Sequence, residues 1–287
     1  MPSPASRVVV SSDWVAAHLN DPSIAIAEVD SHPGETYAVG HIPGAIGWGL
    51  HTDFEDSIRR DIPTADAIAS LLGKAGVAND TPIVLYGDGN NRSATWAFWV
   101  LKYYGHNDVR LMDGGRKKWL AESRPLTTKD TPRRKSVAYV PGRPHRQLRA
   151  LRDQIVKRIG KDGVTILDTR AYEEFAGLLT AAPGGHQPDI QRKGRIPGAV
   201  HLPWDDASAS DGSFKPAVQL RKLYSSVGVS PDDEIIAYCR LGVRASYSWF
   251  VLKYLLGYAN VRNYDGSWTE WGNAIGVPIE TGEPKNR

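Results

Sequence analysis

The chain has 287 residues, of which 41% are hydrophobic and 23% are charged, so it contains enough apolar material for two soluble domains of ordinary size. The formal net charge of +3 gives no reason to expect nucleic acid as a partner, although it is compatible with a small anionic substrate. The single cysteine, Cys239, excludes an internal disulfide framework and a four-cysteine zinc site.

The N-terminal residues give no sign of a targeting segment. Residues 1–10 lack the apolar core of about 7–15 residues that a secretory signal needs. No apolar run approaches the roughly 18 residues needed to cross a bilayer, so we expect no membrane partner. A free thiol also suits a reducing compartment, and we therefore expect a cytoplasmic protein.

The first half alternates expected helices and strands. Ser11, Ser12 and Asp13 offer N-cap side chains before the first helix, and Gly105 ends the last long one. In chain order we expect a helix over 14–19, a strand over 24–29, a turn over 42–45 into a strand over 46–50, a helix over 64–72, a strand over 83–86, a helix over 94–104 and a strand over 109–112. This alternation predicts a parallel sheet with helices on both faces.

The second half repeats the first. Matching pairs are Ile83–Tyr86 with Ile235–Tyr238, Asp113-Gly114 with Asp265-Gly266, Trp119 with Trp271, and Ile42-Pro43-Gly44-Ala45 with Ile196-Pro197-Gly198-Ala199. Solenoid repeats have periods of about 20–50 residues, so this much longer spacing indicates duplicated domains.

The repeat and the composition of the connecting segment give the domain boundaries. We expect an α/β fold with a non-catalytic domain over 1–126 and a catalytic domain over 148–287. The intervening segment 127–147 holds Pro132, Pro141 and Pro144 and reads as a surface linker. An insertion rich in Gly, Pro and Ala over 177–193 is either a loop over the site or a surface excursion.

Cys239 directly follows the expected buried strand that ends at Tyr238, and a helix is expected from about Ala245. Ligands of open α/β sheets bind beyond the carboxyl ends of the strands, and a helix N-terminus favours a thiolate there. Arg240 and Arg244 add permanent positive charge. Gly242 permits the positive φ that lets successive N–H groups converge on an anion. The segment therefore reads as a nucleophile loop.

Two other interpretations of the loop remain open. A lone cysteine is often only a small buried hydrophobic residue, although the two arginines that follow Cys239 in the loop favour a functional thiol. Protein tyrosine phosphatases use Cys-x5-Arg, one residue longer than the Cys239-to-Arg244 spacing here. The shorter loop suits one added sulfur atom better than a phosphate group, but a phosphatase stays an alternative. No zinc-binding spacing appears, and we expect neither a metal nor an organic cofactor.

Several motifs together resemble the two-domain rhodaneses, the thiosulfate sulfurtransferases, and in particular their bacterial branch. They are the loop Cys239-Arg240-Leu241-Gly242-Val243-Arg244, the two Ile-Pro-Gly-Ala turns, Asp168-Thr169-Arg170, and Tyr264-Asp265-Gly266-Ser267-Trp268-Thr269-Glu270-Trp271. The resemblance covers essentially the whole chain. It implies that Cys239 is the catalytic nucleophile and cycles between thiol and persulfide. The substrate-binding residues it implies are Arg240, Leu241, Gly242, Val243 and Arg244.

The resemblance also implies a reaction. Sulfane sulfur would move from thiosulfate to cyanide, to a thiol or to a sulfur-accepting protein, with release of sulfite. An arginine directly after the cysteine resembles the thiosulfate-using type, since the mercaptopyruvate-using type typically has Cys-Gly-Ser-Gly-Val-Thr. A 3-mercaptopyruvate sulfurtransferase remains an alternative, as does a persulfide carrier protein with incidental turnover.

The chain departs from the family pattern at several positions. The second turn has Arg195 where the family usually has histidine, and Glu174 stands where animal thiosulfate enzymes have an arginine. A substrate contact at that position is lost, or Arg192 or Arg195 supplies it. Asp168 and Arg170 either orient the loop or form a structural ion pair at a strand end.

The first half lacks the nucleophile. Gly87 occupies the position that matches Cys239, while Arg92 still matches Arg244. We therefore expect the first domain to be structural.

Overall fold

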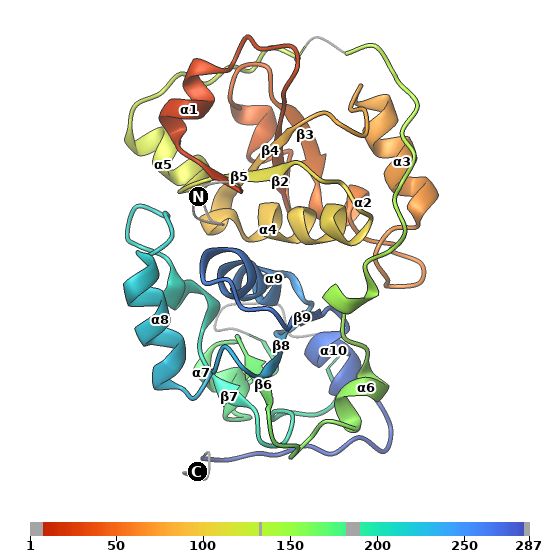
Figure 1. Ribbon diagram of the computed structural model, residues 1–287, viewed down its shortest axis with the longest axis vertical. Coiled ribbons are helices and arrows are strands. Elements are labelled where there is room, and N and C mark those ends of the chain that lie inside the picture. The colour runs from red at the N-terminus through yellow and green to blue at the C-terminus, as the bar shows by residue number, and fades with distance from the viewer. Residues whose placement is uncertain (1–7, 132–133, 182–189, 284–287) are drawn as a thin grey trace. The chain divides into compact units, whose positions relative to one another are not determined.

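The computed structural model describes residues 8–131, 134–181 and 190–283. It divides the chain into two compact units (Figure 1). Unit 1 comprises Met1–His145 together with Ser208–Phe214, and unit 2 comprises Arg146–Ala207 and Lys215–Arg287. Part of the 177–193 insertion, residues 182–189, lies outside the described residues.

Unit 1 contains a sheet of five parallel strands in the order β1-β5-β4-β2-β3 among its described residues. Its elements are β1 (Val9–Val10), α1 (Ser12–Ala17), β2 (Ala25–Asp30), η2 (Tyr37–Val39), β3 (Ile46–Gly49), α2 (Leu50–Asp53), α3 (Ala65–Lys74), β4 (Ile83–Tyr86), α4 (Asp88–Tyr103), β5 (Val109–Met112) and α5 (Gly115–Ala121). The central strand β4 is entirely apolar and fully buried, as expected for a sheet covered on both faces.

Unit 2 repeats this plan with four parallel strands in the order β7-β6-β8-β9 among its described residues. Its elements are η3 (Arg146–Leu148), α6 (Arg152–Val156), β6 (Val164–Asp168), α7 (Tyr172–Phe175), β7 (Val200–His201), η4 (Trp204–Ala207), α8 (Ala217–Ser226), β8 (Glu234–Tyr238), α9 (Val243–Phe250), η5 (Val251–Leu255), β9 (Val261–Tyr264) and α10 (Ser267–Trp271). The expected α/β fold with two similar domains is confirmed.

Local sequence signals explain where several helices begin. The Ser11 hydroxyl accepts a hydrogen bond from the Trp14 amide, and the Thr64 hydroxyl accepts one from Ala67. These contacts satisfy amides that a helix leaves unpaired at its first turn. Thr64 therefore caps α3, and Ser11 places the start of α1 at Ser12, two residues earlier than the apolar pattern predicts.

Two long helices differ from the expected ranges. The segment assigned to α4 begins at Asp88, but Gly89, Asn90 and Asn91 have positive φ, so regular helix follows only after them. In unit 2, α9 begins at Val243 and continues as one π-helical stretch, η5. Periodicity in the sequence does not reveal either feature, because both depend on backbone conformation at single residues.

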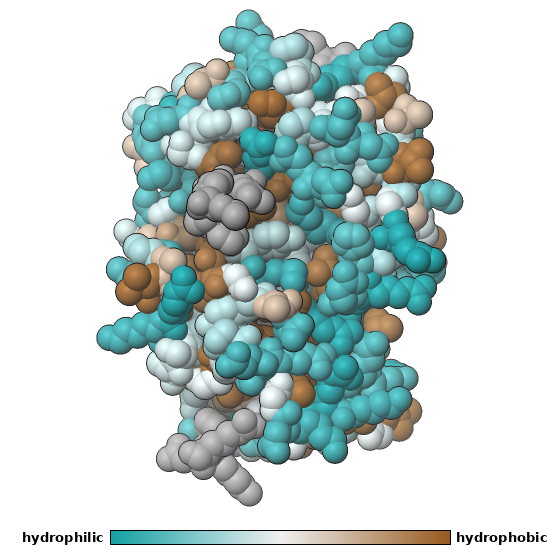
Figure 2. Space-filling view, in the orientation of Figure 1, coloured by the Kyte–Doolittle hydropathy of each residue, from teal (hydrophilic) through white to brown (hydrophobic). Residues whose placement is uncertain are grey.

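Apolar side chains fill a separate core in each unit. Val84, Tyr86 and Trp119 belong to the core of unit 1, and Ile236, Tyr238 and Trp271 to that of unit 2. The face visible in Figure 2 is mostly hydrophilic, with small scattered groups of apolar residues. Among the described residues, no helix is both long and apolar enough to span a bilayer.

Candidate active site

The loop that joins β8 to α9 holds Cys239 in a buried position. The strand ends at Tyr238, so Cys239 emerges at its carboxyl end, and only 1% of the cysteine is exposed. Gly242 has φ of 86°, which a residue with a side chain rarely adopts. This conformation turns the Gly242 amide back toward the sulfur, and its nitrogen lies 3.1 Å from Cys239 Sγ. Within the described ranges one loop amide, that of Gly242, donates to the sulfur, so the convergence of successive N–H groups stays a prediction.

The start of α10 holds the loop from outside. Ser267 Oγ accepts a hydrogen bond from the Cys239 amide at 3.0 Å and donates one to the Tyr264 carbonyl at 2.7 Å. The Trp268 amide donates to the Cys239 carbonyl at 2.9 Å. The Thr269 hydroxyl and amide both donate to the Arg240 carbonyl, at 2.8 and 3.0 Å. The backbone of the loop is therefore fixed by a segment far along the chain.

A second support reaches the other end of the loop. Asn263 is fully buried on β9, and its Nδ2 donates to the Gly242 carbonyl at 3.3 Å. The same carbonyl accepts the Ser246 amide of α9 at 2.9 Å. Hydrogen bonds thus fix both the amide and the carbonyl of Gly242. They favour the orientation in which the Gly242 N–H points at the Cys239 sulfur.

Arg244 is held by Glu174 in a bidentate ion pair. The two Nη–Oε distances are 2.7 and 2.9 Å, and the Glu174 side chain is fully buried. Burial acts to lower the pKa of Arg244, but the Glu174 hydrogen bond and the charge of a Cys239 thiolate outweigh it and raise that pKa. Arg244 therefore stays cationic and interacts electrostatically with the sulfur. Glu174 is the partner of this cation.

Arg240 has an unpaired side-chain donor. Its Nε is buried and has no hydrogen-bond partner among the described residues. An unpaired buried donor is costly unless an anion or water satisfies it. Arg240 therefore carries a buried N–H donor that no group of the described chain satisfies.

Asp168 and Arg170 form a fully buried ion pair next to the strand that carries Cys239. Arg170 donates to both carboxylate oxygens, with Nη2 at 2.6 Å, and its guanidinium lies 4.5 Å from the centre of the Trp268 ring. The Tyr238 hydroxyl donates to Asp168 at 2.5 Å and accepts from the Ile196 amide at 3.2 Å. The Tyr238 hydroxyl thereby connects the Asp168–Arg170 pair to the Ile-Pro-Gly-Ala turn.

Arg192 and Arg195 hold the C-terminal segment of the chain. Arg192 donates to the carbonyls of Trp271, Gly272, Ala274 and Val277. Arg195 is 1% exposed, pairs with Glu280 at 2.7 Å and donates to the Gly282 carbonyl at 2.6 Å. Neither guanidinium hydrogen-bonds to the loop over 239–244 within the described ranges. In the structure both guanidinium groups bind the C-terminal segment, and the substrate contact considered for them stays a prediction.

In the matching loop of unit 1, a residue of the loop itself makes the hydrogen bonds that hold the backbone. Gly87 corresponds to Cys239, and its amide donates to Oδ1 of Asn91 at 2.9 Å. Asn91 Nδ2 then donates to the Met112 carbonyl at 2.7 Å. Asn91 thus makes the two bonds that Ser267 makes in unit 2, but from inside the loop. Gly115, which matches Ser267, has no side chain to contribute.

Sequence reasoning missed the supports that lie outside the loop. Ser267 and Thr269 belong to a motif that is visible in the sequence, but no role could be assigned to them from it. Glu174 is visible only as a departure from the family pattern, whereas the structure identifies it as the partner of Arg244. Among the described residues, no group of three or more His, Cys, Asp or Glu side chains could hold a metal ion.

Comparisons with known proteins find similar chains over nearly the whole length of this one. The family model described as "Rhodanese-like domain" matches residues 11–122 and 151–274. A sulfur carrier protein, TtuD, from Thermus thermophilus is 49% identical, covering 96% of this chain and 98% of that protein. A Mycolicibacterium smegmatis protein named "Putative thiosulfate sulfurtransferase" is 44% identical, covering 96% of this chain and 99% of that protein.

Solved structures share the fold. An anaerobic ergothioneine biosynthesis enzyme from Chlorobium limicola, bound to trimethyl histidine, aligns with a TM-score of 0.87 at 22% identity. The alignment covers 98% of this chain and 71% of that one. The wild-type structure of EanB aligns with a TM-score of 0.86 at 22% identity, covering 99% of this chain and 71% of that one.

Proposed function

Because the chain belongs to the rhodanese family, we propose that it is a thiosulfate sulfurtransferase that works through a persulfide on Cys239. The observation that carries the proposal is the Gly242 amide, which lies 3.1 Å from the sulfur in a loop that also bears Arg240 and Arg244. Relatives at 43–45% identity are named as putative thiosulfate sulfurtransferases, which supports sulfurtransferase chemistry. Residues 148–287 would form the catalytic domain, after a non-catalytic domain over 1–126 and a linker over 127–147.

The first step loads the protein with sulfur. The Cys239 thiolate attacks the outer sulfur of thiosulfate, a new S–S bond forms, and the S–S bond within thiosulfate breaks. Sulfite leaves with the electron pair of that bond. The N–H groups of the loop stabilise the terminal persulfide sulfur, since hydrogen bonds to a charged acceptor are about twice as strong as neutral ones.

The second step returns the protein to its thiolate. A nucleophilic acceptor such as cyanide or a thiol attacks the outer persulfide sulfur, and the S–S bond to Cys239 breaks. With cyanide the product is thiocyanate. The protein itself carries the sulfur, so no step needs a metal or an organic cofactor.

The charges of the site support thiosulfate as the donor. Thiosulfate is a dianion, and its sulfonate oxygens need donors that stay charged at any physiological pH. Arg240 supplies such a group with an unpaired buried Nε. Arg244 adds positive charge beside the sulfur while Glu174 fixes its position. We propose a cytoplasmic location, because a reducing compartment keeps the thiol free.

Intact-mass measurement tests the persulfide directly. After thiosulfate treatment and removal of excess donor, the chain should gain the mass of one sulfur atom, and cyanide should remove it. Cys239→Ala should gain nothing. A gain in Cys239→Ala, or no gain in the wild-type chain, would contradict the proposal. Release of phosphate from p-nitrophenyl phosphate that depends on Cys239 would favour the phosphatase alternative.

A second candidate is a sulfur carrier that docks on an acceptor protein. The Thermus thermophilus relative, at 49% identity, bears that name. A carrier would form the persulfide but turn over poorly with cyanide and small thiols. Steady-state rates with several small acceptors therefore separate the two candidates. Comparison of kcat/KM for thiosulfate and 3-mercaptopyruvate tests the remaining alternative, and a large excess for mercaptopyruvate would overturn the choice of donor.

A further inference from the structure

A charged cavity lies in unit 2 at the amino ends of β8 and β9. Glu234 begins β8, whereas Cys239 follows the last residue of the same strand, so the cavity and the nucleophile are at opposite ends of the sheet. Its volume is about 550 Å³, which is within the range of small-molecule sites. The charged residues that line it are Arg146, Arg158, Glu234, Lys253 and Arg262.

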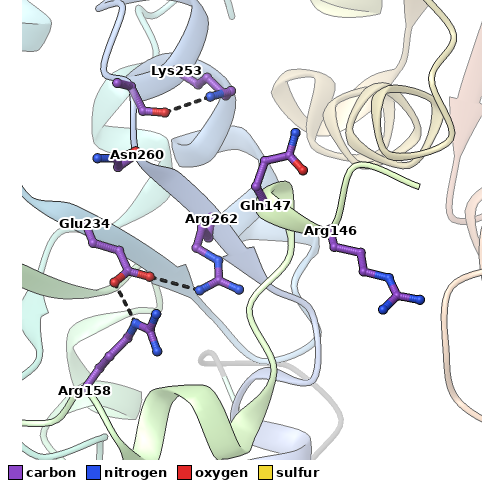
Figure 3. Close-up of a pocket in the computed structure, with 8 residues that line it drawn as sticks. Arg146, Gln147, Arg158, Glu234, Lys253, Asn260 and Arg262 are labelled. Atoms are coloured by element: carbon purple, nitrogen blue, oxygen red, sulfur yellow. Dashed lines mark hydrogen bonds and ion pairs between the residues drawn. The ribbon is translucent and has the colours of Figure 1, made fainter. Parts of the chain in front are cut away.

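The Glu234 carboxylate pairs with two of the four cations. Glu234 accepts from Arg158 Nε at 2.6 Å and from Arg262 Nη1 at 2.9 Å, as the dashed lines in Figure 3 show. Burial acts to raise the pKa of Glu234, but these two guanidinium groups outweigh it and lower that pKa. Glu234 is therefore ionised at neutral pH and balances one of the four positive charges around the cavity.

The remaining cations lack an anionic partner. Figure 3 shows Arg146 and Gln147 on one side of the Arg262 side chain and Lys253 and Asn260 on the other, and all four residues line the cavity. The Arg146 side chain has no hydrogen-bond partner in the part of the chain that the structure describes. Within the described part of the chain, Lys253 Nζ donates only to the neutral Ala259 carbonyl, at 3.0 Å, and burial lowers the pKa of Lys253. An anion in the cavity would compensate both charges.

We propose that this cavity binds a small phosphate-type oxyanion with two or three negative charges, of the pyrophosphate or phosphoester class. Guanidinium groups bind such oxyanions through paired N–H donors, and the excess positive charge around the cavity matches the ligand in sign and size. The site does not depend on sulfur chemistry, because the lining residues belong to neither the catalytic loop nor its supports.

Titration calorimetry with pyrophosphate on the full chain tests the site. Binding to the wild-type chain should be measurable at low ionic strength and should weaken as salt is added. Arg146→Gln and Lys253→Gln should each weaken it about tenfold, the effect of losing one charge-assisted contact. Both replaced side chains lie at the rim of the cavity, and equal melting temperatures would show that the variants remain folded.

Two control variants separate this site from other sources of binding. Lys222→Gln removes an exposed cation of α8 outside the cavity, and it should bind pyrophosphate as the wild-type chain does. Arg240→Gln removes a cation of the catalytic loop and should also retain binding. The proposal is overturned if the wild-type chain binds no pyrophosphate, if Lys222→Gln loses as much affinity as the cavity variants, or if only Arg240→Gln loses it.

Discussion

The Ser267 hydroxyl should be a major determinant of both stability and sulfur loading. Ser267→Ala removes its hydrogen bonds to the Cys239 amide and the Tyr264 carbonyl, both of which are buried. A buried polar group left unpaired costs about 1–3 kcal/mol, so two such groups should lower the free energy of unfolding by about 2–4 kcal/mol after some relaxation. Alanine keeps the Cβ at the same positive φ of 51°, so backbone strain does not differ between the two chains.

Urea unfolding and the rate of persulfide formation measure the two consequences. A loop that loses its tie to Ser267 should load sulfur at least about tenfold more slowly, since about 1.4 kcal/mol of lost transition-state stabilisation suffices. Ser248→Ala is the matched control, because Ser248 is an equally buried serine of α9 whose hydroxyl makes no bond to the loop in the described chain. The reasoning is refuted if Ser267→Ala unfolds and loads sulfur like Ser248→Ala.

Three further changes have expected outcomes. Glu174→Gln leaves Arg244 buried without its counter-ion, so the free energy of unfolding in urea should fall by about 3–5 kcal/mol, and an unchanged value would contradict the structural role of the pair. Burial raises the pKa of Glu28 to about 7, so the folded chain keeps a proton that the unfolded chain releases above about pH 4.5. Wild-type stability should therefore fall by about 3 kcal/mol between about pH 4.5 and pH 7, whereas Glu28→Gln should lack this decline in urea titrations at the two pH values. Gly87→Cys in a Cys239→Ala background should gain no sulfur by intact mass and should be destabilised, because a Cβ at Gly87 would lie 2.4 Å from a carbonyl oxygen of β2; persulfide formation there would contradict this geometry.

The sequence predicts the parts of the site that are close together along the chain. Residues 235–244 contain the strand, the thiol, the glycine and the two arginines. The apolar run and the residue types of this segment can be recognised without a structure. The parallel sheets are equally predictable, because a buried parallel strand is a continuous apolar run. The internal repeat adds the domain plan.

The contacts made at long range could not be predicted in this way. Ser267 meets Cys239 only because the ends of β8 and β9 lie at the same edge of the sheet. Charge alone suggested that Arg192 and Arg195 could bind substrate, but a sequence does not show where a guanidinium points. In the structure the Arg192 guanidinium donates to backbone carbonyls, and the Arg195 guanidinium donates to the Gly282 carbonyl and pairs with Glu280. The contacts of each guanidinium group therefore depend on its orientation, which residue type alone does not give.

The asparagine inside the unit 1 loop makes the divergence of the two copies hard to reverse. A cysteine at Gly87 meets a carbonyl of β2, and a serine at Gly115 would bring its Cβ within 2.2 Å of Asn91 Oδ1. Removing Asn91 first would leave the Gly87 amide and the Met112 carbonyl unpaired. Each of these single substitutions toward the arrangement of unit 2 is therefore unfavourable, and they would have to occur together. A loop held by its own asparagine thus resists conversion, one residue at a time, into a loop that carries a thiol.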